Sequence, residues 1–373
     1  MTVLLLLFVQ VWQFGRPIPH PGFGMAAAAV GDTVYCFGGM TGDPSHPMLR
    51  NPSDAYDASR DTWLTGLPSL PRQRAYAGCA AHEGKVYVLG GSDGYYEYRR
   101  CDRFDPATRR WDTIASLPAS IQVAGACSYA GSLYLVGGYS SCLGSYVRRV
   151  YRYLPGDGPG TWVQVDSMNE LRASMGLAVA CGRMYAVGGK FYNSLASAEY
   201  FDGTQWTTLP RPMAGPRGGL AAVAYDSLYV CAIGGTYMSA PLEIVEVLDC
   251  RTENWLTVEP LQSPRYYLSA ALAAGKLVVI GGRDDDRVVG SVETHPAWFP
   301  GIRAVQGPEV PLPSVRSCVS DGRWTAAGLR WDVVDAAGNL VESGTGSKEL
   351  RLRPGVYFYR QAQTGSSKVT VIR

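Results

Sequence analysis

The sequence predicts an all-β protein: a β-propeller of six four-stranded blades, followed by a small antiparallel β-sandwich of immunoglobulin-like form. Three observations lead to this prediction. Paired glycines end six strand-like runs, single tryptophans recur at a constant distance before those pairs, and the C-terminal part alternates short strand-like runs with turns. The 44 glycines and 23 tyrosines among 373 residues also favour β-structure with many tight turns.

The paired glycines follow runs such as VYCFGG, VYVLGG and LYLVGG, and their first members are 52, 47, 51, 46 and 47 residues apart. A repeat of roughly 48 residues with several short strands is typical of propeller blades. Glycine adopts positive φ, so we expect the chain to turn out of the second strand there while a tryptophan packs over the bare backbone. The structural pairs are Gly38 and Gly39, Gly90 and Gly91, Gly137 and Gly138, Gly188 and Gly189, Gly234 and Gly235, and Gly281 and Gly282.

The tryptophans keep the same rhythm as the glycine pairs. From each tryptophan to the next pair the count is 27, 26, 26, 28 and 26 residues, starting from Trp63, Trp111, Trp162, Trp206 and Trp255. Runs such as DRFDPATRRW place an aromatic residue, an aspartate and a polar turn before the tryptophan. Each unit therefore reads as strand, turn, strand with two glycines, variable loop, strand, Asp-rich turn, and strand with tryptophan.

This combination of paired glycine, Asp turn and spaced tryptophan resembles the kelch repeat over residues 12–298. The resemblance implies a six-bladed propeller. It also implies a binding surface on the loops that join strands two to three and strand four to the next blade, which open on one face.

Closure of the ring has two candidates. Trp12 precedes Gly38 by 26 residues, so we expect WQFGRPIPHPG to supply the outer strand of the sixth blade and leave no open sheet edge. The alternative is Trp298, in THPAWFPGI. We prefer Trp12.

Four segments follow from these patterns. Residues 1–11 form an apolar run that is either a signal peptide or a buried first strand, and it is too short to span a bilayer. The propeller occupies 12–298, a proline-bearing linker 299–315, and the sandwich 316–373. No other segment reaches transmembrane length. A net charge of +2 without blocks of like charge gives no case for nucleic acid binding.

The C-terminal segment resembles the type A sorting domain of the type IX secretion system. The resemblance is carried by WDVVDAAGNLVESG, LRPGVYFYRQ and the terminal KVTVIR. The family's Asn-Pro-Asn-Pro-like opening is absent, and VPLPSV stands in its place. The resemblance implies the secretion machinery as a partner, with a secreted or outer-surface location on a bacterium. The alternative is an immunoglobulin-like accessory domain.

Two sets of loop-face residues are candidate ligand contacts. Arginines nine to eleven residues past a tryptophan could form an anion-binding ring at the channel mouth, or could bond carbonyls of the next blade. They are Arg72, Arg172, Arg217 and Arg265. Loop tyrosines could stack sugars or anchor a protein, or could pack the loops together. They are Tyr95, Tyr96, Tyr146, Tyr192, Tyr237 and Tyr267.

We expect no metal and no cofactor. The four histidines show no paired spacing, no C-x-x-C pair occurs, and nucleotide-binding and nucleophile-elbow motifs are absent. The run Asp284, Asp285, Asp286 is expected to be a solvated loop rather than a calcium site. The nine cysteines are expected to be mostly buried thiols, with a Cys101–Cys142 disulfide as the alternative.

Together these features predict a secreted binding protein without catalytic activity, whose partner is a protein or a glycan. The alternative is an exported enzyme acting on sugar acids, similar to the kelch-type sialic acid epimerases. In that alternative the arginine ring would hold the substrate carboxylate, but the sequence identifies no acid and base.

Overall fold

The computed structural model describes residues 11–42 and 46–296, and, as backbone strands only, 323–335, 340–351, 357–363 and 366–372. The chain divides into two compact units, Met1–Phe299 and Pro300–Arg373. The first ten residues and the predicted linker at 299–315 lie outside the described residues. In the described part the helical structure is one short 3-10 turn, η1 (Ser141–Leu143).

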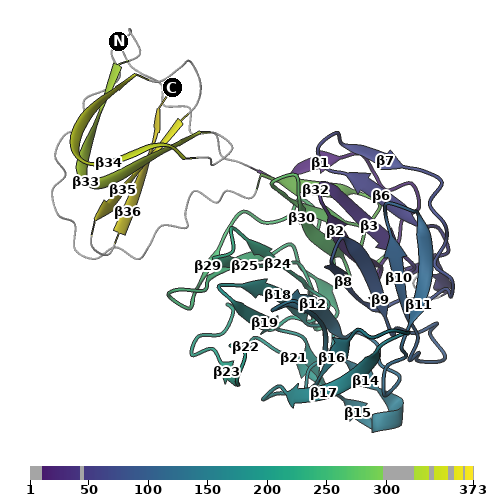
Figure 1. Cartoon of the computed structure of the whole chain (residues 1–373). Helices are drawn as coiled ribbons and strands as arrows, with labels where there is room; N and C mark the ends of the chain where they lie inside the picture. Colours follow the sequence, from purple (N-terminus) through teal and green to yellow (C-terminus); the bar gives the residue numbers. More distant parts are fainter. Residues whose placement is uncertain are drawn as a thin grey trace. The chain divides into compact units, whose positions relative to one another are not determined.

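The first unit is a six-bladed β-propeller, as predicted, and each blade is a four-stranded antiparallel sheet. In Figure 1 the first strands of the blades surround the centre and the fourth strands lie at the periphery. The blades are β2 (Ala26–Val30), β3 (Thr33–Phe37), β6 (Asp54–Asp57) and β7 (Thr62–Leu64); β8 (Gly78–His82), β9 (Lys85–Leu89), β10 (Cys101–Asp105) and β11 (Arg110–Ile114); β12 (Gly125–Tyr129), β13 (Ser132–Val136), β16 (Arg149–Leu154) and β17 (Thr161–Ser167); β18 (Gly176–Ala180), β19 (Arg183–Val187), β22 (Ala198–Phe201) and β23 (Trp206–Thr208); β24 (Ala221–Tyr225), β25 (Tyr229–Ile233), β28 (Val245–Asp249) and β29 (Asn254–Thr257); and β30 (Ser269–Ala273), β31 (Lys276–Ile280), β32 (Val292–His295) and β1 (Gln13–Gly15).

The N-terminal strand closes the ring, which confirms the prediction made from Trp12. Strand β1 pairs with β32 as the fourth strand of the sixth blade. Trp12 is 1% exposed, and its Nε1 donates a hydrogen bond to the carbonyl of Glu259 at 3.0 Å. The rival, Trp298, lies outside the described residues. Closure by the N-terminus removes an open sheet edge.

Six backbone amides, one from each loop between blades, form a closed hydrogen-bonded ring. Each N–H donates to the carbonyl of the preceding member at 2.8 Å, and the first member donates to the last. Every member has a left-handed φ, between +49° and +65°, including a β-branched valine. In order the members are Gly24, Tyr76, Val123, Ser174, Gly219 and Tyr267.

The first glycine of each pair makes room for the next blade. A Cβ added at Gly188 would lie 2.7 Å from the carbonyl oxygen of Arg217, in the loop that leads to the following blade. The six first glycines also have φ between +58° and +64°, a region that side chains disfavour. The same carbonyl contact occurs at Gly38 with Arg74, Gly90 with Ile121, Gly137 with Arg172, Gly234 with Arg265 and Gly281 with Gly22.

The second glycine donates its N–H to that same carbonyl, so each pair ties two blades together. The bond from Gly189 to the Arg217 carbonyl measures 2.9 Å, for example. The prediction that a tryptophan packs over the bare glycine is wrong, because a carbonyl of the neighbouring blade occupies that place.

Five tryptophans, including Trp12, instead hydrogen-bond to a backbone carbonyl near the outer strand of the preceding blade. One of these bonds runs from Trp162 Nε1 to the Ala115 carbonyl at 3.0 Å. The tryptophan spacing in the sequence therefore marks contacts between neighbouring blades.

Buried arginines reinforce the same junction. Arg172 accepts the Gly138 N–H with its carbonyl, while its guanidinium donates to the Gly188 carbonyl at 2.8 Å and pairs with Glu199 at 3.0 Å. Burial lowers the pKa of the equivalent arginines, and the facing carboxylates oppose that effect in part. The equivalent pairs are Arg74 with Asp102, Arg217 with Glu246 and Arg265 with Glu293.

These pairs correct the predicted anion-binding ring. Arg172, Arg217 and Arg265 are at most 1% exposed, so they bond carbonyls of the next blade, the structural alternative considered above. Arg72 is exposed and bonds the Tyr98 hydroxyl at 2.8 Å. The residue equivalent to the other three is Arg74, which, like Arg172 and Arg265, lies 16 residues before the first glycine of its blade.

The first and third blades have other residues in place of this arginine and its carboxylate partner. In the first blade, Gly22 occupies the arginine position, and a Cβ there would lie 2.7 Å from Arg50 Cδ. Arg50 enters from the second-to-third-strand loop, bonds the Gly38 carbonyl and pairs with Asp54. In the third blade an apolar pairing replaces the ions. Ile121 takes the place of the arginine. Tyr151, which pairs with Leu135, takes the place of the acid that the other blades carry.

The cysteines of the described part are free thiols, so the Cys101–Cys142 disulfide is absent. Cys101 is buried in the core between the second and third blades, whereas Cys142 is exposed in a loop. Burial raises the pKa of Cys36, Cys101 and Cys127 to about 12, which fits small apolar side chains rather than reactive thiols. Cys318 lies outside the described residues.

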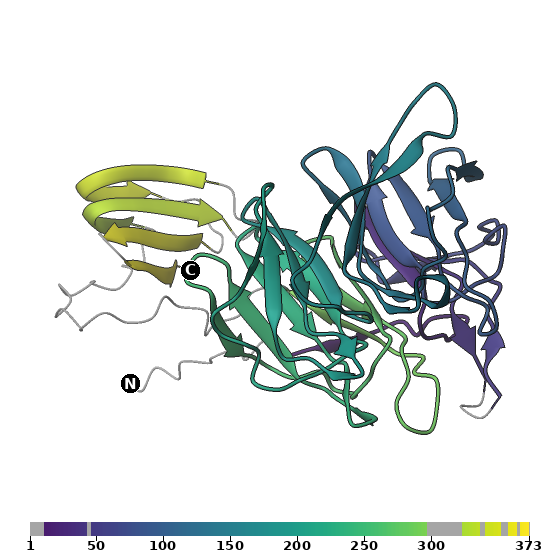
Figure 2. The same cartoon turned by 90° about the horizontal axis from the view of Figure 1, so that it is seen from below.

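The described residues of the second unit form a four-stranded antiparallel sheet in the order β34–β33–β35–β36. Its strands are the yellow arrows in Figure 2. Its strands are β33 (Arg323–Asp335), β34 (Leu340–Arg351), β35 (Tyr357–Gln363) and β36 (Ser366–Ile372). The stretch GTGS, a turn-like sequence, lies inside the continuous strand β34. A second sheet is not among the described residues, so the sandwich stays a prediction.

The buried ion pairs predict a specific stability pattern. Replacing Arg265 by Met leaves Glu293 buried without its cation, so we expect a loss of about 3–5 kcal/mol in the free energy of unfolding. The double variant Arg265→Met/Glu293→Leu should recover most of it, because the third blade already uses apolar residues there. Urea unfolding followed by tryptophan fluorescence measures both. The control, Arg72→Met, should unfold like the parent; equal effects of Arg72→Met and Arg265→Met would contradict the assignment.

Candidate functional site

The loop face of the propeller is built from one repeated arrangement. After each glycine pair the chain forms a small hairpin or bridge that also pairs with the loop between blades, as Gln122 does with Tyr139. Four of these extensions are regular two-stranded hairpins: β4 (Met40–Thr41) with β5 (Met48–Leu49), β14 (Tyr139–Ser140) with β15 (Ser145–Tyr146), β20 (Lys190–Phe191) with β21 (Asn193–Ser194), and β26 (Thr236–Tyr237) with β27 (Ala240–Pro241). Side chains at their tips therefore stand on a rigid base.

Large apolar side chains gather at these tips. We call them the apolar loop tips, and they come from five of the six blades. Tyr95 is 92% exposed, Met238 82% and Tyr192 74%. The full set is Met48, Tyr95, Tyr96, Leu143, Phe191, Tyr192, Tyr237 and Met238. Exposed apolar groups concentrated on one face mark interaction surfaces.

In the second blade, hydrogen bonds fix the loop backbone that carries the exposed side chains. The Asp93 carboxylate accepts hydrogen bonds from the backbone N–H groups of Tyr95 and Tyr96, at 2.9 and 2.7 Å, and from the Tyr98 hydroxyl. Burial alone would raise the pKa of Asp93, but these hydrogen bonds outweigh it and lower that pKa. Arg72 stacks over the Tyr98 ring at 5.0 Å. The backbone is thus fixed while the two tyrosine rings project into solvent.

An aromatic cluster spans the third and fourth blades. Tyr146 contacts Phe191 and Tyr192 at centroid distances of 5.7 and 5.5 Å, and it also contacts Tyr139 at 5.6 Å. Edge-to-face contacts at these distances are favourable. The predicted ligand residues Tyr146 and Tyr192 therefore lie together.

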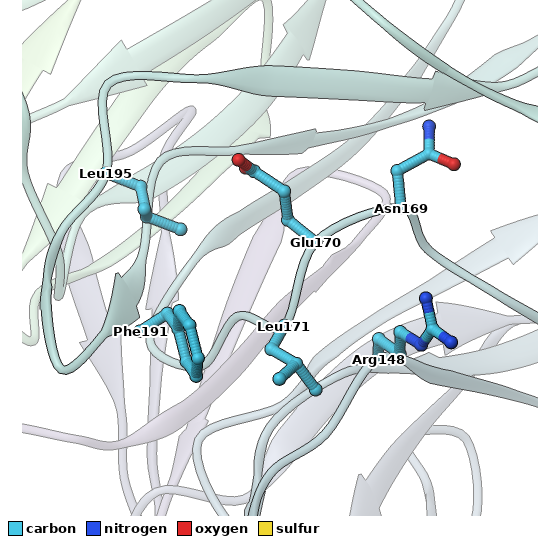
Figure 3. Close-up of a pocket in the computed structure, with 6 residues that line it drawn as sticks. All are labelled: Arg148, Asn169, Glu170, Leu171, Phe191 and Leu195. Atoms are coloured by element: carbon cyan, nitrogen blue, oxygen red, sulfur yellow. The ribbon is translucent and has the colours of Figure 1, made fainter.

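A groove of about 440 Å³ lies beside this cluster, between the third and fourth blades. Figure 3 shows Phe191 and Leu195 at one end of it and Arg148 and Asn169 at the other, with Leu171 between them. Glu170 also lines it. Pockets of this volume accept small ligands or individual side chains of a partner. Sequence reasoning missed this groove, because no residue in it follows the repeat.

The channel mouth is narrower. A cavity of about 130 Å³ there is lined by the amide-ring residues and their successors. Tyr76 and Tyr267 contact edge-to-face at 5.0 Å, and burial raises the pKa of Tyr76. The predicted contact Tyr267 is half-buried, which agrees with the loop-packing alternative.

The structure thus divides the predicted ligand residues into separate groups. It exposes Tyr95, Tyr96, Tyr192 and Tyr237 on the loop face and half-buries Tyr146 and Tyr267. The missed tip residues include Met48 and Met238, although Met238 directly follows Tyr237 in the sequence.

Within the described residues, no group of three His, Cys, Asp or Glu side chains is placed to hold a metal. The acidic loop is held by its own bonds, since Asp284 accepts the N–H groups of Asp286 and Arg287 and pairs with the Arg287 guanidinium. None of the described helical structure has the length and apolarity to cross a bilayer.

Known proteins share the motifs of this architecture. The family model described as the Kelch motif matches residues 73–118 and 171–213, which contain the second and fourth blades. The Kelch-like protein terF of Aspergillus terreus is 25% identical over 294 residues, which cover 71% of this chain and 62% of that protein.

Two further relatives show the same kind of partial similarity. The human Kelch repeat and BTB domain-containing protein 13 is 32% identical over 232 residues, covering 58% of this chain and 49% of that protein. Alpha-scruin of Limulus polyphemus is 27% identical, covering 64% of this chain and 28% of that protein. The chain thus spans less than two thirds of each of these relatives. It is a six-bladed β-propeller that carries kelch motifs.

Proposed function

We propose that this chain is a binding protein without catalytic activity, which holds a protein partner on the loop face of its propeller. The observation that carries the proposal is the set of apolar loop tips. Aromatic and methionine side chains are enriched in protein–protein interfaces. Here they stand on turns whose backbones are fixed by their own hydrogen bonds, so little freedom is lost on binding.

A protein partner fits this surface better than a glycan. The tips include two methionines and an exposed leucine, which offer apolar contact but no stacking plane for a sugar ring. The enzyme alternative depended on exposed arginines that would hold a sugar-acid carboxylate. Since Arg172, Arg217 and Arg265 are buried in ion pairs, no observation favours that alternative.

We also propose that the C-terminal segment directs export to the outside of a bacterium through the secretion machinery. The support is the sequence resemblance, and the antiparallel sheet includes the resembling strands within β33, β35 and β36. Because Trp12 is buried in the sixth blade, a leader peptide could be removed only before that residue without opening the ring.

The binding proposal predicts the behaviour of a triple variant, Tyr95→Ala/Tyr96→Ala/Met238→Ala. Loss of three interface side chains should reduce partner capture about tenfold or more, measured by quantitative mass spectrometry of proteins retained from the producing cells. The control is Leu256→Ala, an apolar residue that is 39% exposed in the outer strand β29. Unchanged capture by the triple variant, or specific binding to a glycan array through these residues, would contradict the proposal.

The export proposal predicts that a chain lacking residues 316–373 stays inside the producing bacterium, while the full chain reaches the medium or surface. Immunoblotting of cell fractions measures this, and thermal unfolding checks that the shortened propeller still folds. Mass spectrometry of the exported chain should find Trp12 retained. Equal export of both chains would overturn the sorting role.

A further inference from the structure

We propose that the groove between the third and fourth blades binds an acidic segment of the protein partner. A large apolar side chain of that segment occupies the end formed by Phe191, Leu171 and Leu195, and a nearby Asp or Glu pairs with Arg148. The inference rests on the proposed function and names the chemistry that the partner presents.

The walls of the groove are preorganised. The Arg148 carbonyl accepts the Met168 N–H at 2.7 Å, which ties the third-blade loop to the segment that precedes Leu171. Asn169 donates its N–H to Glu199 at 2.7 Å and its side-chain amide to the Trp206 carbonyl at 3.1 Å. A ligand therefore meets a formed surface and does not have to order it.

The wall contributed by the fourth blade is fixed in the same way. The Leu195 N–H donates to the Gly189 carbonyl at 2.8 Å, and the Leu195 carbonyl accepts the Arg217 N–H at 3.0 Å. The Leu171 backbone belongs to the loop that joins the third and fourth blades, whereas the Leu195 backbone is bonded to the loop that joins the fourth and fifth. Both backbones at the apolar end of the groove are therefore held by loops that join neighbouring blades.

The charge at the polar end selects an acid. The Arg148 side chain is exposed and, among the described residues, has no carboxylate within ion-pair distance. The one acid lining the groove, Glu170, is already engaged, because its Oε2 accepts from Arg172 at 2.5 Å and from the Ser197 hydroxyl. Arg172 also pairs with Glu199, so it is shared by two carboxylates, but the Arg148 guanidinium itself has no paired carboxylate and favours one on the partner.

The surface beyond the groove favours a polypeptide over a small molecule. Phe191 is in contact with Tyr192 and Tyr146, and Leu143 of the adjoining loop is also exposed. A volume of about 440 Å³ holds one or two side chains, so a short segment would fill it and continue across these aromatic rings. An acid beside a large apolar residue satisfies both ends.

The test uses the full chain and a phage-displayed library of random dodecapeptides. We expect the enriched peptides to share an Asp or Glu close to a large apolar residue. A synthetic peptide of the enriched sequence is then measured by fluorescence anisotropy. Arg148→Glu should weaken its binding about tenfold or more, and Phe191→Ala by a similar factor. The control Arg110→Glu, at an exposed position on the opposite face, should leave binding within about twofold.

A second peptide with every acid changed to its amide should bind about fivefold or more weakly to the parent chain. Thermal unfolding checks that each variant is folded. If Phe191→Ala does not fold, Arg148→Glu alone still tests the inference. A library without an enriched acidic–apolar sequence, or equal binding by Arg148→Glu and the parent, overturns the inference. Peptides that depend on Tyr95, Tyr96 or Met238 but not on Arg148 overturn it while leaving the proposed function intact. If peptide binding depends neither on Arg148 and Phe191 nor on Tyr95, Tyr96 and Met238, both the inference and the proposed function fail.

Discussion

The structure depends on one contact, repeated six times: a backbone carbonyl from the loop to the next blade lies against the bare Cα of a glycine. At Gly188 a Cβ would lie 2.7 Å from the Arg217 carbonyl oxygen, and the following glycine donates its N–H to that oxygen. The contact needs positive φ and no side chain, and glycine alone provides both at no cost. Because each blade docks on the previous one in this way, the ring of amides at the mouth can close with every bond at 2.8 Å.

Comparison of the six junctions between blades shows that the backbone contact is constant while the side chains beside it differ. The carbonyl is present in all six junctions, whereas the side chain of the residue that supplies it is an arginine, an isoleucine or a glycine. At Gly22 the missing side chain is replaced by Arg50, which arrives from a different loop and bonds the same kind of glycine carbonyl. The buried charge therefore strengthens the junction, while the backbone contact creates it. A core held in this way leaves the loop tips free to carry apolar side chains without loss of the fold.

The sequence predicted the fold well because the contact leaves a direct trace in it. Glycine pairs mark the junctions, and the tryptophan interval identified Trp12 as part of the last blade. The physical role of the tryptophan was missed, since its partner is a carbonyl of another blade, which spacing does not reveal. Arg72 and Arg74 both lie nine to eleven residues after Trp63, so that interval does not distinguish them, whereas the distance of 16 residues to the glycine selects the buried Arg74. The site was less predictable. Exposure of Tyr95 and Tyr192 agreed with expectation, but the groove at Arg148 and Phe191 combines residues from two blades outside any repeat.

The most direct test of the junction is amide hydrogen exchange at the six ring residues, with single-residue resolution by mass spectrometry. If the six blades are locked by one closed set of bonds, the amides of Gly24, Tyr76, Val123, Ser174, Gly219 and Tyr267 should be among the slowest. They should also exchange at one common rate, set by global unfolding of the propeller. Fast or independent exchange at one of them, with the others still protected, would contradict the account.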